Sequence, residues 1–283
     1  MTNYKNDFSL YIYSTNIVGS NKAKSYIKAL DWLSKVLQAV PLGFDDCKNI
    51  WTVNSIDRLQ ELYLFVLQEA RKKDASQWNM KDIPKSYLQK GYCSAAIRSY
   101  QDFLVGQNYE EDLIEIFKNH KGDEPDIVKK LKKEIVVPSF LKEDLKNIQG
   151  KEYMRSVRVR ANQNVFRKMI LHIYNQTCCI TGLNIPEINI ASHIIPWTVD
   201  ETIRLDPANG LCLSATYDSA FDKCLISLDD DYRLIISKNI KDYYKNENVK
   251  EYFISQEGRK IAMPIAYLPK KEYIQRHRSN GEF

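Results

Sequence analysis

Three segments decide the fold of the second half of the chain: CCITGLNIPEINIASHIIPW (178–197), RLDPANGLCL (204–213) and TYDSAFDKCLISL (216–228). They contain short, β-branched runs bounded by Gly, Pro, Asn or Asp, which is the pattern of strands separated by turns. Strands are therefore predicted at 188–194, 210–213, 224–228 and 233–237. The three aspartates between the last two runs either form a hairpin turn or bind a metal, and turn chemistry is favoured.

Four polar residues follow one another through this region. His193 ends the first predicted strand, and Asn209 lies sixteen residues later. Asp218 and Asp222 share a helix face at i and i+4, so they could converge on one hard cation, which prefers oxygen ligands. An imidazole titrates near neutral pH and can take a proton from water when another group fixes its tautomer. Each residue alone also has a structural explanation: a packed His, an Asn bonding its own turn, or acids at a helix start.

Five linked motifs over roughly residues 155–240 resemble the HNH nucleases, and within them the bacterial HNH restriction endonucleases. They are NQNVFR (162–167), CCITG (178–182), ASHIIPW (191–197), LDPANGL (205–211) and YDSAFD (217–222). The resemblance implies a ββα-metal fold, in which two strands joined by a long loop and a following helix surround one divalent ion. The predicted order of strand, loop, strand and helix agrees with that fold.

The resemblance also implies roles for the four polar residues. His193 would be the general base that activates water against a phosphodiester, and Asn209 would steady the loop and the base or reach the metal. Asp218 is the expected metal ligand, with Asp222 second. The implied cofactor is one divalent ion, Mg²⁺ first, with Mn²⁺ or another divalent ion as alternatives.

Two positions depart from the family pattern. Tyr217 stands in the stretch where the third histidine of the motif is expected, and Ser192 stands where many HNH nucleases have an acidic or His ligand. Both are interpreted as supporting residues. The six cysteines form no C-x-x-C pair, so neither a structural zinc nor a disulfide framework is predicted.

The first half of the chain has a helical pattern. Apolar residues at three- and four-residue spacing predict helices at 26–40, 56–70 and 97–104, the second capped by Asn54 or Ser55, and a separate shorter helix near 110–118. A further helix is predicted to begin near Asn162 or Asn164.

These patterns predict an α+β protein with a helical N-terminal domain followed by a ββα-metal (HNH) nuclease domain. The expected divisions are a recognition or dimerisation domain at 1–125, a basic linker at 126–154, and the nuclease domain with a C-terminal extension at 155–283.

Positive charge is concentrated in one part of the sequence. The chain of 283 residues carries 41 Lys and Arg against 36 Asp and Glu, but residues 129–168 alone hold twelve against four. A local positive stripe favours binding to a polyanion, although a solvated helix face is the alternative. Nucleic-acid contacts are expected from four arginines: Arg155, Arg158, Arg160 and Arg167. On an extended chain, Arg158 and Arg160 would face the same side.

The sequence as a whole predicts a metal-dependent HNH DNA endonuclease, acting in restriction or phage defence on duplex DNA. A duplex cutter with one site per chain must dimerise or nick twice, so a homodimer is expected. The alternative is a nucleic-acid-binding protein with a degenerate, non-cleaving HNH module. No apolar run of about 18 residues and no secretory signal pattern occurs, which predicts no membrane association and a cytoplasmic location.

Overall fold

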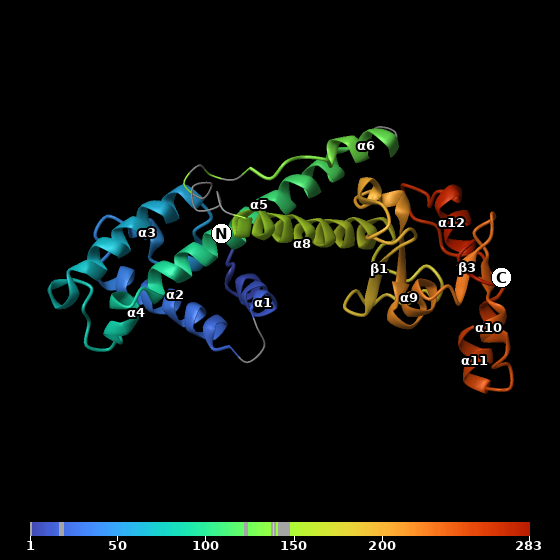
Figure 1. Ribbon diagram of the computed structural model, residues 1–283, viewed down its shortest axis with the longest axis horizontal. Coiled ribbons are helices and arrows are strands. Elements are labelled where there is room, and N and C mark those ends of the chain that lie inside the picture. The colour runs from blue at the N-terminus through green and yellow to red at the C-terminus, as the bar shows by residue number, and fades with distance from the viewer. Residues whose placement is uncertain (1, 17–19, 122–123, 137, 139, 141–147) are drawn as a thin grey trace. The chain divides into compact units, whose positions relative to one another are not determined.

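The computed structural model of the protein describes residues 2–16, 20–121, 124–136, 138, 140 and 148–283 (Figure 1). The chain divides into two compact units, one of residues 1–109 with 135–154 and one of residues 110–134 with 155–283. Its main elements in chain order are α1 (Lys5–Thr15), α2 (Lys22–Ala39), α3 (Ile56–Arg71), α4 (Lys85–Gln89), α5 (Tyr92–Asn119), α6 (Glu124–Lys130), α8 (Ile148–Ile173), β1 (Asn189–His193), β2 (Gly210–Ser214), α9 (Ala215–Asp222), β3 (Ile226–Leu228), β4 (Leu234–Ile236), α10 (Lys238–Lys241), α11 (Glu247–Tyr252) and α12 (Lys271–Arg278).

The first unit is helical, as its apolar spacing predicts. Leu30, Leu59 and Ile97, from α2, α3 and α5, are fully buried in one common core. The predicted cap of α3 is confirmed, because the Ser55 hydroxyl accepts a hydrogen bond from the backbone N–H of Arg58 at 3.2 Å. This bond satisfies one of the free donors at the helix start.

The prediction of a separate helix near 110–118 is wrong. Helix α5 runs without interruption from Tyr92 to Asn119. A single glycine, Gly106, does not end a helix whose apolar stripe continues. Tyr109, Leu113 and Phe117 extend the stripe at four-residue intervals, and all three are buried.

Strands β1 and β2 and helix α9 form the centre of the second unit and confirm the predicted order of strand, loop, strand and helix. The two strands are antiparallel, with His193 opposite Gly210, and α9 packs against both. Helix α8 lies so close to this sheet that a Cβ atom on Gly210 would be 2.3 Å from Cδ1 of Ile170. Only glycine fits at this close approach.

Helix α8 begins much earlier than predicted, at Ile148 and not near Asn162 or Asn164. The Asn164 side chain does not cap a helix and instead donates a hydrogen bond to Glu110 Oε1 at 2.8 Å. The polar sequence before Asn162 hides the helix, but Val157, Ala161 and Val165 are buried at four-residue intervals along it.

A second hairpin follows α9. Strands β3 and β4 are antiparallel, and Asp229 Oδ1 accepts hydrogen bonds from the backbone N–H groups of Asp231 and Arg233 at 2.9 and 2.8 Å. The interpretation of these acids as turn residues is therefore confirmed. Within the described residues, none of the helices combines the length and the apolar character that crossing a membrane requires.

Candidate active site

His193 lies at the end of β1, between an aromatic ring and a loop. Its imidazole stacks on the ring of Phe166 from α8, with ring centroids 3.6 Å apart and planes inclined by 11°. Trp197 contacts it edge-on at 5.4 Å. These two contacts fix the plane of the imidazole.

One ring nitrogen of His193 is held by the backbone. Nε2 lies 3.1 Å from the carbonyl oxygen of Arg204. Because a carbonyl can only accept a hydrogen bond, Nε2 carries the proton and the neutral ring keeps a lone pair on Nδ1. Nδ1 makes no hydrogen bond to any residue that the structure describes. The His193 side chain is half-buried, so the ring is not fully enclosed.

The environment of His193 keeps the ring neutral. Burial lowers its pKa to about 4, with a further lowering by the charge of Arg204 that is opposed by the hydrogen bond to the Arg204 carbonyl. At pH 7 the imidazole is therefore unprotonated at Nδ1 and can accept a proton.

Arg204 holds the loop of residues 194–209 in shape. Its Nε donates to the carbonyl oxygen of Trp197 at 2.9 Å, and its Nη2 donates to Glu201 Oε1 at 2.8 Å. Its guanidinium also lies 4.9 Å from the Trp197 ring centre. The sequence did not point to Arg204, because this residue orients His193 through its backbone carbonyl, a group that every residue type has.

Asn209 is fully buried and ties the two ends of this loop together. Its Oδ1 accepts a hydrogen bond from Ile195 N at 2.8 Å, and its Nδ2 donates to the carbonyl oxygens of Ile195 and Ile203 at 3.2 and 3.5 Å. Of the roles expected for Asn209, these contacts support the steadying of the loop.

Asp206 anchors the same loop to the C-terminal segment. The residue is buried, and its Oδ1 accepts from Ala208 N at 2.9 Å. Its Oδ2 accepts from Lys270 Nζ at 2.7 Å and from the Tyr273 hydroxyl at 2.9 Å. Asp206, the aspartate of LDPANGL, thus has structural partners far away in the sequence, which no local pattern predicts.

Asp218 and Ser192 face each other from α9 and β1. Burial raises the pKa of the half-buried Asp218 carboxyl, the Ser192 hydroxyl lowers it, and the charge of Asp222 raises it further. Ser192 Oγ is buried and has no hydrogen bond of normal geometry to any described residue. Asp222 is exposed on the last turn of α9.

These three oxygen-bearing side chains fit a hard divalent cation. A half-buried carboxylate without a cationic partner among the described residues, beside an unsatisfied hydroxyl, is a donor set that Mg²⁺ prefers. Over the described ranges there is no group of three or more His, Cys, Asp or Glu placed to hold a metal. Ser192 and Asp222 both act on the pKa of Asp218, and His193 contacts the Arg204 carbonyl oxygen.

Tyr217 has a different surrounding from Asp218, although the two are neighbours. Its ring is buried, 5.5 Å from that of Phe253, and its hydroxyl donates a hydrogen bond to the carbonyl oxygen of Tyr252. Burial raises its pKa to about 12. Tyr217 thus holds α11 against α9.

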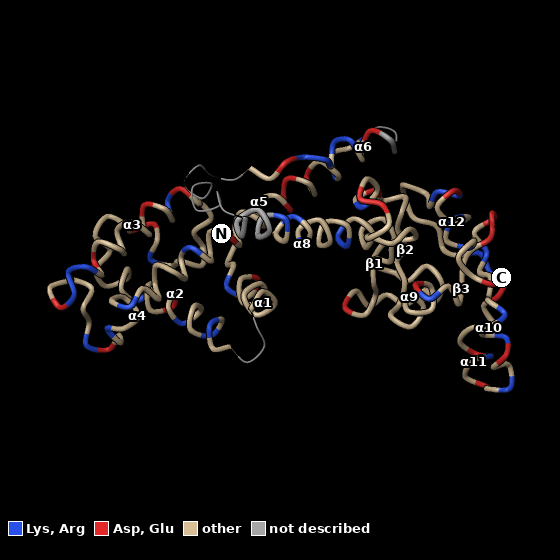
Figure 2. Tube along the Cα trace, viewed as in Figure 1, with Lys and Arg blue, Asp and Glu red and all other residues tan. Residues whose placement is uncertain are grey.

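The four arginines singled out by the sequence differ in their environments. Arg155 and Arg158 are exposed and lie one turn apart on α8, where Figure 2 shows the basic positions along the helix. The expectation that Arg158 and Arg160 share one side of an extended chain is wrong, because residues two apart do not share a helix face. Arg160 is half-buried, and Arg167 donates to the carbonyl oxygens of Asn189 and Pro186 at 2.6 Å each.

A second imidazole, that of His277 in α12, is packed in the same unit. Its ring stacks on Phe221 with centroids 3.8 Å apart and planes inclined by 4°. Nε2 lies 3.0 Å from the Phe221 carbonyl oxygen, and Nδ1 lies 2.9 Å from Ser227 Oγ. Burial lowers its pKa.

The part of the chain that contains His193 and Asp218 matches a known protein family. Residues 178–229 match a family model described as HNH endonuclease. The matched segment contains His193, Asn209, Asp218 and Asp222. No curated protein matches the chain.

Proposed function

We propose, from the HNH endonuclease domain that residues 178–229 form, that this protein is a metal-dependent DNA endonuclease that hydrolyses phosphodiester bonds in restriction or phage defence. The family itself supports a nuclease function on a nucleic acid, and the α+β fold with this domain in its C-terminal part agrees with the sequence prediction. The observation that carries the proposal is the imidazole of His193, neutral and held by Arg204 O with Nδ1 open.

The proposed chemistry starts from a water molecule beside His193. Nδ1 takes a proton from the water as its oxygen attacks phosphorus, while Nε2–H remains hydrogen-bonded to the Arg204 carbonyl. The phosphorus–O3′ bond breaks, and O3′ acquires a proton from solvent. The products carry 5′-phosphate and 3′-hydroxyl ends.

Asp218, Asp222 and Ser192 would hold the divalent ion. When bound there, such an ion supplies charge stabilisation for the phosphate and the leaving oxygen. The residue types suit this task, because carboxylate and hydroxyl oxygens are the ligands that hard cations take.

Arg155 and Arg158 are proposed to contact phosphates of duplex DNA, since both are exposed and one helical turn apart. A homodimer, or two successive nicks, would then cut both strands. The defence role rests on the resemblance to bacterial HNH restriction endonucleases.

The test is digestion of supercoiled plasmid, phage DNA and RNA with Mg²⁺, with Mn²⁺ or with EDTA. Cleavage of DNA that requires a divalent ion supports the proposal, and mapping of the ends checks the product chemistry. The Asp218→Asn variant should need at least about tenfold more metal for half-maximal cleavage. Asp222→Asn is the matched variant, and its more exposed carboxylate should matter less. Equal cutting in EDTA and in Mg²⁺ would contradict metal dependence.

A second candidate function is nucleic-acid binding without cleavage. Two observations favour it: Ser192 offers a hydroxyl where an acidic ligand is usual, and the Tyr217 hydroxyl is engaged by Tyr252. Salt-sensitive DNA binding by the wild type, with no cutting of any substrate in either metal, would support this function over the first.

A further inference from the structure

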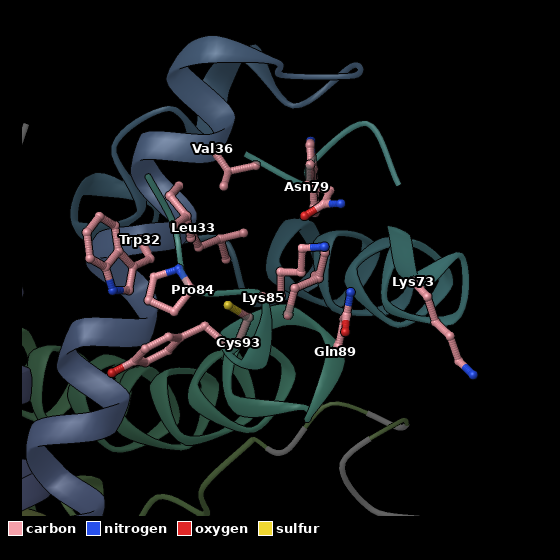
Figure 3. Close-up of a pocket in the computed structure, with 13 residues that line it drawn as sticks. Trp32, Leu33, Val36, Lys73, Asn79, Pro84, Lys85, Gln89 and Cys93 are labelled. Carbon is pink, nitrogen blue, oxygen red and sulfur yellow. The ribbon is translucent and has the colours of Figure 1, made fainter. Parts of the chain in front are cut away.

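The aromatic side chains of the two units differ in whether a ligand can reach them. In the first unit, Trp32, Trp78 and Tyr87 line a pocket between α2 and α4 (Figure 3). The space inside this pocket is sufficient for about one water molecule, and Trp78 is buried. These rings therefore belong to the core of the first unit and do not form a site for a ring-sized ligand.

The segment of residues 238–252, from α10 to the end of α11 in the second unit, presents its tyrosines to solvent (Figure 1). Tyr243, Tyr244 and Tyr252 are exposed by 66, 55 and 54%. Their hydroxyl groups make no hydrogen bond to any residue that the structure describes. Single exposed apolar side chains are common on protein surfaces, but three rings within ten residues form a cluster that indicates a binding surface.

The backbone of residues 238–252 is fixed at both ends. At its start, Lys238 N donates to the Glu282 carbonyl oxygen at 3.0 Å. At its end, the Tyr217 hydroxyl donates to the carbonyl oxygen of Tyr252, which attaches the segment to α9, the helix that carries Asp218. Because the backbone is already held, the exposed rings can bind a ligand with a small loss of conformational entropy.

Positive charge lies among these tyrosines. Residues 238–246 carry three Lys against one Asp. Two of these lysines, Lys238 and Lys245, are exposed and make no ion pair with a described residue. Lys245 Nζ lies 6.0 Å from the ring centre of Tyr244. Exposed ammonium groups beside exposed rings suit a single-stranded nucleic acid, because the ammonium groups contact phosphates and the rings stack on bases.

We propose that residues 238–252 bind unpaired bases of the DNA substrate, which stack on the three exposed tyrosines while Lys238 and Lys245 contact the adjoining phosphates. Stacking requires unpaired bases, since neighbouring bases cover each base face inside a duplex. A second copy of the segment is a poorer partner, because contact between two copies would bring like charges together. The inference rests on the proposed DNA endonuclease function and deepens it, because it names unpaired DNA as a form of the substrate that the second unit binds.

The test measures binding of the full chain in EDTA, so that cleavage plays no part. A thymidine strand of about 12 nucleotides is compared, at fixed salt, with a fully abasic strand of the same length. The wild type should bind the thymidine strand at least about 25-fold more tightly than the abasic strand. Tyr243→Ala should lower the affinity for the thymidine strand at least about fivefold and leave the affinity for the abasic strand unchanged. Tyr243→Phe keeps the ring and should bind both strands as the wild type does.

Matched variants separate the stacking contacts from the phosphate contacts. Tyr13 is exposed by 59% but lies in α1 of the first unit, so Tyr13→Ala should leave both affinities unchanged. Lys245→Ala should weaken binding of both strands and lower the slope of log affinity against log salt by about 0.7, whereas exposed Lys24→Ala, in α2, should change neither. If Tyr243→Ala does not fold, Tyr252→Ala gives the same test.

Equal binding of the two strands by the wild type would overturn the inference, and so would unchanged binding by folded Tyr243→Ala. An equal loss of affinity for both strands in Tyr243→Ala would also overturn it, because the tyrosine would then contact phosphates and not bases. A change in molar mass by light scattering in Tyr243→Ala, with both strand affinities unchanged, would assign this surface to a second copy of the chain.

Plasmid cleavage in Mg²⁺ is scored separately from strand binding. A protein that prefers the thymidine strand as predicted but never cuts refutes the nuclease proposal alone. A protein that cuts but binds both strands equally refutes the stacking surface alone.

Discussion

His193 and His277 occupy two regions of the second unit that share two kinds of contact. Each imidazole stacks on a phenylalanine, and each directs Nε2 at a backbone carbonyl oxygen. They differ at Nδ1, which accepts from the Ser227 hydroxyl in His277 but makes no hydrogen bond to a described residue in His193. Burial and a lowered pKa are therefore not what distinguish a candidate base. The distinguishing feature is a ring nitrogen that is free to accept a proton.

The largest expected effect comes from removing the two imidazoles in turn. His193→Ala should lower the cleavage rate by about 10²- to 10⁴-fold, because it removes the proton acceptor, and should leave DNA binding intact. His277→Ala should leave the rate per folded molecule within about threefold and should instead lower the free energy of unfolding by about 2 kcal/mol. Single-turnover cleavage and urea denaturation of both variants check this pair. Equal cutting by His193→Ala and the wild type would remove the base from the mechanism.

Acid should destabilise the protein through His193. Its pKa in the folded state, about 4, lies below the ordinary 6.5, so the unfolded chain binds a proton first as the pH falls. The free energy of unfolding is thus highest above pH 6.5 and declines between about 6.5 and 4, by about 3 kcal/mol from this group. On acidification, the free energy of unfolding of His193→Gln should fall by about 3 kcal/mol less than that of the wild type. Urea denaturation across this pH range measures the difference. The raised pKa of Asp218 acts in the opposite direction in both proteins and cancels in the difference.

The loop of residues 194–209 can be loosened without touching either imidazole. Lys270→Ala leaves the buried Asp206 carboxylate without its cation and should cost about 2 kcal/mol of folding free energy, and Tyr273→Phe about 1 kcal/mol. Exposed Lys271→Ala is the matched control and should stay within about 0.5 kcal/mol of the wild type. Cleavage should slow in the first two variants, since this loop carries the Arg204 carbonyl. A stable Lys270→Ala protein would mean that the anchoring contact contributes little.

The smallest effect is expected from the exposed arginines of α8. Replacing Arg155 and Arg158 together by Gln should reduce the slope of log affinity against log salt by about 0.9 for each phosphate that is no longer neutralised. Arg259→Gln, on an exposed residue away from α8, should leave the slope unchanged. An unaltered slope in the double variant would place both arginines outside the DNA interface.

The sequence predicted the ββα order because alternation, turn residues and an i, i+4 pair are local signals. It predicted Asp229 as a turn residue for the same reason. It misplaced the start of α8, since the buried stripe of Val157, Ala161 and Val165 is narrow within a polar run. It divided α5 at a point where a single glycine is tolerated inside a helix.

The site was harder to predict than the fold, because much of it is made by backbone atoms and distant partners. Arg204 acts on His193 through a carbonyl group, and Asp206 is held by residues more than sixty positions away. Phe166 was visible as an apolar helix position, but its stacking on His193 depends on how α8 crosses the sheet. The roles of His193, Asn209, Asp218 and Asp222 remain predictions for the experiments above.

The central claim, that His193 is a neutral base with an open Nδ1, is tested most directly by nitrogen NMR of ¹⁵N-histidine-labelled protein titrated with acid. The account predicts that His193 stays in the Nε2–H tautomer and gains its second proton only near pH 4. A His193 resonance in the Nδ1–H tautomer, or one that protonates at or above pH 6.5, would contradict it.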